Sequence, residues 1–227
     1  MATVLLVRHG RTAANVQGVL AGWTPGVSLD DVGRDQAAAL AGRLSGVRLD
    51  ALVTSPLERA RETGDLLLDG QRARVPVHVD ERAGECRYGE WTGRALKDLS
   101  KDPLWKVVQG HASGVTFPEG ESMVSMQSRA VEAVRDWNQR LGERAVYALV
   151  SHGDVIKAIL ADALGMHLDQ FQRIVIDPCS VSVIRYTATR PFVVRMNDSG
   201  GDLGFLARKR SRRQGSDAAV GGGAGTA

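Results

Sequence analysis

The 227-residue sequence is poor in cysteine and in aromatic residues, and it lacks long apolar runs. Its two cysteines, Cys86 and Cys179, are too few for a disulfide framework and make no C-x-x-C pair, so we expect free thiols in a cytoplasmic, reducing compartment. No apolar run approaches the about 18–20 residues that a membrane-spanning helix needs. The N-terminus also lacks a basic segment followed by an apolar one. These absences argue against a secretory signal and against a membrane partner.

The basic charge of the chain is concentrated at its C-terminal end. Residues 207–227 contribute +4 to the net charge of +3, which leaves −1 for the first 206 residues. A nearly neutral body gives no case for nucleic-acid binding by the folded domain. From residue 207 the chain runs from a basic segment into Gly, Ala and Ser with nothing to bury, so we predict that residues 201–227 form a disordered, solvated tail.

Residues 1–200 alternate short aliphatic runs with helical patterns, which predicts a single α/β domain with an irregular insertion at about 86–120. The expected helices include one capped by Ser28 and one with Pro56 in its first turn, capped by Ser55. Residues 13–27 are expected to form a loop. Strands are expected at 3–7, 51–54, 75–79, 145–150, 181–184 and 192–194, and helices at 30–45, 56–68, 95–109, 122–141 and 155–164. This order predicts a three-layer sandwich, a mainly parallel sheet with helices on both faces.

Three of the predicted parallel strands end in polar residues. The first runs into Arg8 and His9, the second into Ser55 with Arg59 one turn later, and a later one into Ser151-His152. Because the carboxyl ends of parallel strands share one edge of a sheet, two arginines and two histidines could meet in one crevice.

That set of side chains suits phosphoryl chemistry. The guanidinium fork pairs bidentately with phosphate and stays charged, and helix N-termini after Ser55 and at Gly153 would add backbone N–H donors. A neutral histidine is a competent nucleophile toward phosphorus. The leaving oxygen also needs a proton donor, and Glu85 is the candidate, since partial burial would raise its pKa.

Four blocks of the sequence, in order, resemble the signatures of the histidine phosphatase superfamily, whose fold is phosphoglycerate mutase-like. Each block alone is weak, but together they are specific, and the resemblance covers about residues 3–197. Asp154-Val155-Ile156-Lys157 and Phe171-Gln172-Arg173-Ile174 are also similar to an actinobacterial-type subgroup of probable phosphomutases. The four blocks are Arg8-His9-Gly10 with Thr12 and Asn15, Ser55-Pro56-Leu57-Glu58-Arg59-Ala60 with Thr63, Glu85 with Gly89, Trp91 and Gly93, and Ser151-His152-Gly153.

The resemblance implies a role for each matching residue. His9 would become phosphohistidine, and Glu85 would protonate the leaving oxygen and then act as base for the incoming water. Asn15 would be an auxiliary phosphate contact, and no metal or other cofactor is expected. The phosphoryl group would be bound by Arg8, Arg59 and His152.

Other residues near these blocks have weaker assignments. Gly22 and Trp23 follow the nucleophile and are either substrate contacts or ordinary loop residues, while Gly153 is a candidate substrate contact through its amide. Arg11 stands where the family often has Glu or Gln, which adds positive charge near the pocket mouth. Cys179 to Arg185 formally matches C-x5-R but lacks the glycines of a phosphate loop. Three further histidines have no carboxylate or cysteine at metal-ligand spacing and are interpreted as surface or loop residues: His78, His111 and His167.

The sequence therefore favours a metal-independent phosphomonoesterase that acts on a small phosphorylated metabolite through phospho-His9. A phosphomutase of the phosphoglycerate mutase type is the alternative, although the compact body and the Gly-Glu-Trp-Thr-Gly stretch favour hydrolysis. A catalytically silent phospho-ligand sensor is more remote, because a sensor could dispense with His9 or Glu85. An apolar edge strand near Val193 could pair two chains in a homodimer.

Overall fold

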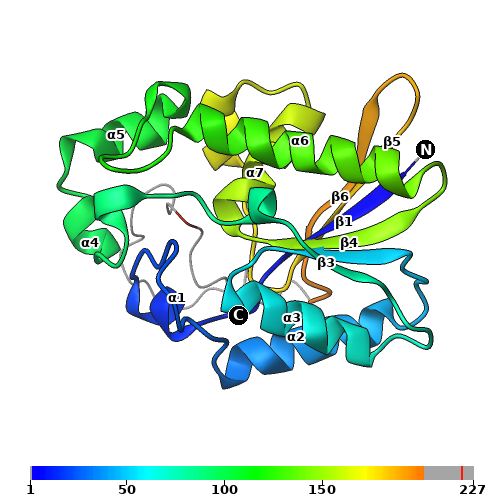
Figure 1. The fold of residues 1–227 in the computed structure, drawn as a ribbon. Coiled ribbons are helices and arrows are strands. Elements are labelled where there is room, and N and C mark those ends of the chain that lie inside the picture. Colours follow the sequence, from blue (N-terminus) through cyan, green and yellow to red (C-terminus); the bar gives the residue numbers. More distant parts are fainter. Residues whose placement is uncertain (1, 202–220, 222–227) are drawn as a thin grey trace.

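The strands of the described chain form one mixed sheet in the order β3-β2-β4-β1-β5-β6 (Figure 1). The structure is a computed structural model that describes residues 2–201 and 221, so nearly all of the tail predicted to be disordered lies outside the described residues. The strands β3, β2, β4 and β1 are parallel, with β3 at one edge, and β5 and β6 form the other, antiparallel side of the sheet. Their bounds are β1 Thr3–Arg8, β2 Ala51–Thr54, β3 Val77–Val79, β4 Val146–Ser151, β5 Val181–Tyr186 and β6 Pro191–Asp198.

Helices cover both faces of this sheet, which confirms the predicted three-layer sandwich (Figure 1). Along β1, Val4 and Leu6 belong to the core on the α6 and α7 side, whereas Leu5 and Val7 belong to the core on the α2 and α3 side. A strand buried on both faces reads as a continuous apolar run, as this one does. The helices are α1 Ala13–Gln17, α2 Asp31–Leu44, α3 Glu58–Asp69, α4 Leu96–Leu99, α5 Pro103–Gly110, α6 Met123–Leu141 and α7 Gly153–Ala163, with single 3-10 turns at Glu81–Ala83, Gly89–Trp91 and Ala112–Gly114 and a longer 3-10 segment at Leu168–Arg173.

Two predicted helix starts are wrong. The cap of α2 is Asp30, whose carboxylate accepts from the amide of Gly33 at 2.7 Å, and not Ser28. Helix α3 begins at Glu58, after Ser55 and Pro56. Asp30 satisfies the capping rule as well as Ser28 does, whereas α3 follows Leu57, which makes no side-chain cap.

Two loop regions also differ from expectation. The predicted loop at 13–27 contains α1, because Thr12 and Asn15 form a reciprocal capping box. The single helix expected at 95–109 is divided into α4 and α5, since Asp102 caps a new helix that has Pro103 in its first turn. Within residues 2–201, none of the helices is long and apolar enough to cross a membrane.

Register brings the polar strand ends together. Arg8 at the end of β1 pairs with Ser151 at the end of β4, and the amide of His9 donates to the Ser151 carbonyl at 3.0 Å. The amide of Ser55, just beyond β2, donates to the carbonyl of Val150 at 3.0 Å. One edge of the parallel part of the sheet therefore carries all three polar ends.

Candidate active site

His9 is buried beside the end of β1, and its contacts fix the tautomer of its ring. Nδ1 lies 2.7 Å from the carbonyl oxygen of Gly10, and Nε2 lies 3.2 Å from Nε of Arg59. A carbonyl only accepts and a guanidinium only donates, so Nδ1 carries the proton and Nε2 carries a lone pair. Burial, then the charges of Arg59 and Arg8, hold the pKa of His9 well below its ordinary value. The ring is therefore neutral and nucleophilic at Nε2.

Two buried arginines surround this imidazole. Arg59, in the first turn of α3, also donates from Nη2 to the carbonyl of Gly22 at 2.9 Å. Its Nη1 is a buried nitrogen without a hydrogen-bond partner in the described part of the chain. Arg8 is held by a 2.7 Å bond from Nη1 to the carbonyl of Ile176. Buried, delocalised cations at this position are suited to an anion with several oxygens.

The second histidine lies against the first. The rings of His9 and His152 have centroids 5.2 Å apart, and Nε2 of His152 is 2.7 Å from the hydroxyl oxygen of Ser55. Burial and the charge of Arg59 lower the pKa of His152, so it too is neutral. Its Nδ1 is buried without a hydrogen-bond partner among the described residues. His152 is also the N-cap of α7, where backbone N–H groups favour an anion.

Among the described residues, Glu85 supplies the one carboxyl group that lines the pocket containing His9 and Arg59. Burial, reinforced by the negative charge of Asp154, raises the pKa of Glu85 to about 7. One of its carboxyl oxygens accepts from the amide of Cys86 at 2.9 Å. A carboxyl group that keeps its proton near neutral pH can serve as a general acid.

The pocket extends from these groups along small and apolar residues. Gly22 and Asn15, two of the predicted substrate contacts, line it, and so does Gly221 from the C-terminal segment. The amide of Gly221 donates to a carboxylate oxygen of Asp154 at 2.9 Å. The remaining lining residues are Thr12, Ala14, Gly18, Val19, Leu20, Ala21 and Leu96.

Other predicted site residues take places around the pocket rather than on its wall. Trp23 donates from its indole N–H to the carbonyl of Glu85 at 2.6 Å, so it supports the backbone of the acid. Gly153 begins α7 directly after His152. Arg11 forms a 2.9 Å ion pair with Asp30, and the positive charge expected at the pocket mouth is therefore offset.

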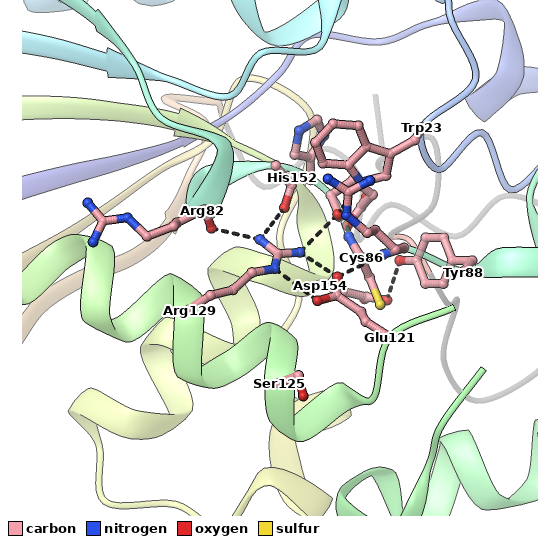
Figure 2. Close-up of polar contacts among 12 residues, drawn as sticks. Trp23, Arg82, Cys86, Tyr88, Glu121, Ser125, Arg129, His152 and Asp154 are labelled. Atoms are coloured by element: carbon pink, nitrogen blue, oxygen red, sulfur yellow. Dashed lines mark hydrogen bonds and ion pairs between the residues drawn. The ribbon is translucent and has the colours of Figure 1, made fainter. Parts of the chain in front are cut away.

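Sequence reasoning missed several polar partners of these groups. Tyr88 donates to Asp154 at 2.9 Å within the core (Figure 2). Asp154 also lies 3.4 Å from Nζ of Lys157. Arg129 on α6 and Glu121 hold the backbone around Glu85. The spacing E-x-x-x-G had already singled out the segment of Glu85, but residues more than 30 positions away could be connected to it only in three dimensions.

Both cysteines, and the histidines at 111 and 167, lie outside the set of residues that lines the pocket. Burial raises the pKa of both thiols, that of Cys179 to about 12, so neither is a ready nucleophile. His111 and His167 are exposed, as the sequence interpretation expected, and both contact the carboxylate of Asp169, at 3.0 and 3.2 Å. Within the described residues, no group of three His, Cys, Asp or Glu side chains could hold a metal ion.

This mixed sheet, with its helices on both faces and its polar residues at one edge, defines a phosphoglycerate mutase-like α/β protein. The chain belongs to the histidine phosphatase superfamily (branch 1), whose family model matches residues 4–199. It is 30% identical over 211 residues to a probable phosphoglycerate mutase GpmB of Yersinia enterocolitica, covering 91% of this chain and 95% of that protein.

Two further proteins are similar to this chain. A glucosyl-3-phosphoglycerate phosphatase of Mycolicibacterium vanbaalenii is 30% identical over 176 residues, covering 74% of this chain and 76% of that protein. The solved structure of Bacillus stearothermophilus YhfR superposes with a TM-score of 0.80 at 30% identity, covering 87% of this chain and 98% of that one. Relatives of this chain thus include a phosphatase and a probable mutase.

Proposed function

We propose that this protein is a metal-independent phosphomonoesterase that acts on a small phosphorylated metabolite through a phosphohistidine at His9. The observation that carries the proposal is the fixed tautomer of His9, whose Nε2 lone pair is the nucleophile next to a buried arginine. Glu85, a carboxyl group that is protonated near neutral pH, lines the same pocket. One wall therefore offers a nucleophile, an anion-binding cation and an acid.

The proposed reaction has two transfers. In the first, Nε2 of His9 forms a bond to phosphorus while the bond to the leaving oxygen breaks, and Glu85 gives that oxygen its proton. In the second, a water attacks the phosphohistidine, Glu85 takes a proton from the water, and the N–P bond breaks to release phosphate. Arg8 and Arg59 neutralise the charge on the non-bridging oxygens, which is the main requirement of phosphoryl transfer, and the neutral His152 binds the same group by hydrogen bonding.

A phosphomutase is the second candidate, because the relative from Yersinia enterocolitica is a probable phosphoglycerate mutase. Similarity to a phosphatase of Mycolicibacterium vanbaalenii supports hydrolysis equally well. The two activities share the phosphohistidine and differ in whether water or a second substrate oxygen accepts the phosphoryl group.

The deciding experiment incubates the protein with phosphorylated sugars, glycerates, inositol conjugates and nucleotides in EDTA and measures both free phosphate and isomerised product. Phosphate release that is lost in His9→Ala supports the esterase. Isomerised product without free phosphate selects the mutase. If the wild type turns over none of the panel, the enzyme proposal fails, and a phosphorylated ligand that binds without acid-labile phosphate on His9 would select the sensor.

Three broader features belong to the same proposal. We propose a cytoplasmic location, which two unpaired, buried cysteines support. We also propose that residues 1–200 form a single domain with an insertion at 86–120. A homodimer through β6 is supported by the apolar side chains that this edge strand exposes, Phe192, Val194 and Met196. Light scattering over a range of concentrations tests the dimer, and a monomer at every concentration would exclude it.

A further inference from the structure

The backbone that carries Glu85 is held by side chains rather than by neighbouring strands or helices. The carbonyl of Ala83 accepts from the hydroxyl of Ser151 at 2.6 Å. The carbonyl of Glu85 accepts from the indole N–H of Trp23 at 2.6 Å. The two remaining carbonyls of the segment 82–85, those of Arg82 and Gly84, accept from one donor, which also reaches the carbonyl of Glu85.

That donor is Arg129 of α6, whose guanidinium uses all five of its N–H groups (Figure 2). Nη1 donates to the carbonyls of Arg82 and Gly84 at 2.7 and 2.8 Å, and Nη2 donates to the carbonyl of Glu85 at 3.0 Å. The two remaining N–H groups form a bidentate pair with the carboxylate of Glu121, at 2.9 and 2.6 Å.

Glu121 closes the arrangement on the other side of the acid. Its Oε1 also accepts from the amide of Arg87 at 2.8 Å, and its own amide donates to the Arg87 carbonyl at 2.8 Å. Both side chains are largely buried, with exposed fractions of 19% for Arg129 and 13% for Glu121. The pair thus holds the chain before and after Glu85 and brings no net charge to its surroundings.

We propose that Arg129 and Glu121 are positioning residues, which fix the segment 82–87 so that the carboxyl group of Glu85 points at the leaving oxygen. The inference rests on the proposed function, because it concerns the proton donor of that reaction. A planar fork that meets three carbonyls and a carboxylate cannot be replaced by a lysine, which has the charge but not the geometry. Small displacements of a catalytic group are costly in rate.

Proton donation affects substrates unequally, and this provides the test. The leaving group of an alkyl phosphate such as glycerol 2-phosphate is an alkoxide, which needs the proton. The leaving group of p-nitrophenyl phosphate is a stable phenolate, which does not. We would measure kcat/KM for both substrates in wild type, Arg129→Lys and Trp23→Phe. Arg82→Lys is the matched control, because the Arg82 side chain binds Asp80 and also reaches Asp136 on α6 but holds no carbonyl of the segment.

The expected result is a substrate-selective loss. Arg129→Lys should lower kcat/KM for glycerol 2-phosphate by about 10-fold or more, which is part of the rate enhancement that a general acid contributes. It should lower kcat/KM for p-nitrophenyl phosphate by about 2-fold or less. Trp23→Phe should show a smaller loss with the same selectivity, and it keeps the test valid if Arg129→Lys does not fold. Arg82→Lys should leave the ratio of the two substrates unchanged.

The outcomes separate this inference from the proposed function. Equal losses for both substrates, or no loss, would overturn the positioning role while leaving the phosphatase intact, since a structural defect lowers the active fraction for every substrate alike. A selective loss in Arg82→Lys as well would also overturn it. A wild type that hydrolyses neither substrate overturns the proposed function and this inference with it.

Discussion

Nε of Arg59 donates a hydrogen bond to Nε2 of His9 over 3.2 Å, so the cation contacts the nitrogen atom that carries the lone pair. The carbonyl of Gly10 holds the opposite nitrogen, Nδ1, at 2.7 Å. A phosphoryl group that approached Nε2 would therefore meet the guanidinium at the same time. Burial, together with this nearby positive charge, lowers the pKa of His9 and keeps the imidazole unprotonated.

Replacing Arg59 by Met should weaken catalysis and also change its pH dependence. We expect kcat/KM to fall by about 10²–10³, as for the loss of one preorganised donor to a developing charge. Without the Arg59 charge the pKa of His9 rises toward its ordinary value, so the acid limb of the pH–rate profile should move to higher pH. The control is Arg61→Met, which removes an exposed arginine from the same helix. An unmoved acid limb, or an equal loss in the control, would contradict this account.

Glu85→Gln should remove the basic limb of the same profile. With its pKa raised to about 7, Glu85 loses its proton as the pH rises through neutrality, and the rate for an alkyl phosphate should fall over that range. The glutamine variant cannot donate, so kcat/KM for glycerol 2-phosphate should drop by about 10²–10⁴ and become independent of pH above 7. For p-nitrophenyl phosphate the loss should be small. A basic limb that persists in the variant would show that another group controls it.

Local sequence patterns were sufficient to predict the layers of this fold. The aliphatic run in β1 predicted a buried strand, and the periodic pattern over 122–141 predicted the helix α6, whose cap in the structure is Ser122. The alternation of strands and helices predicted the sandwich. The polar strand ends at His9 and His152 predicted that the two rings meet, and their centroids lie 5.2 Å apart.

The parts that could not be predicted depend on contacts between distant residues. Ser55 fits the rule for a helix cap, yet its hydroxyl lies 2.7 Å from Nε2 of His152, 97 positions away. Arg129 looks like a polar residue on an amphipathic helix, and only the folded chain shows that it holds the carbonyl of Glu85. Local propensity cannot specify such pairs, because their free energy depends on which segments the fold brings together.

Ser55→Ala and Asp30→Ala should separate a site contact from a helix cap. Loss of the Ser55 hydroxyl removes the partner of His152, and we expect kcat/KM to fall by about 10-fold, the equivalent of one hydrogen bond. Asp30 is the actual cap of α2, so its replacement should lower the free energy of unfolding by about 1 kcal/mol and change kcat/KM by less than about 2-fold. Urea denaturation and steady-state kinetics on both variants provide the test. Wild-type kcat/KM in Ser55→Ala would refute the assignment.

Gly89→Ala and Gly93→Ala compare two glycines of the block that follows Glu85. Both have positive φ angles, +54° and +79°, so each alanine should carry a backbone penalty of about 1–2 kcal/mol. A Cβ at residue 89 would also overlap the carbonyl oxygen of Pro118, which accepts from the amide of Glu90 at 2.9 Å, whereas a Cβ at residue 93 meets no heavy atom within 4 Å.

Gly89→Ala should therefore reduce the free energy of unfolding by roughly 2 kcal/mol more than Gly93→Ala, as an overlap with backbone typically does. Urea denaturation at a fixed pH measures this difference, and a constant m-value shows that the unfolded states are comparable. Equal losses would mean that the chain around Pro118 can move away at no cost. The turn at Gly89 would then be free to shift, and it could not be what holds the segment of Glu85 against residues 118–121.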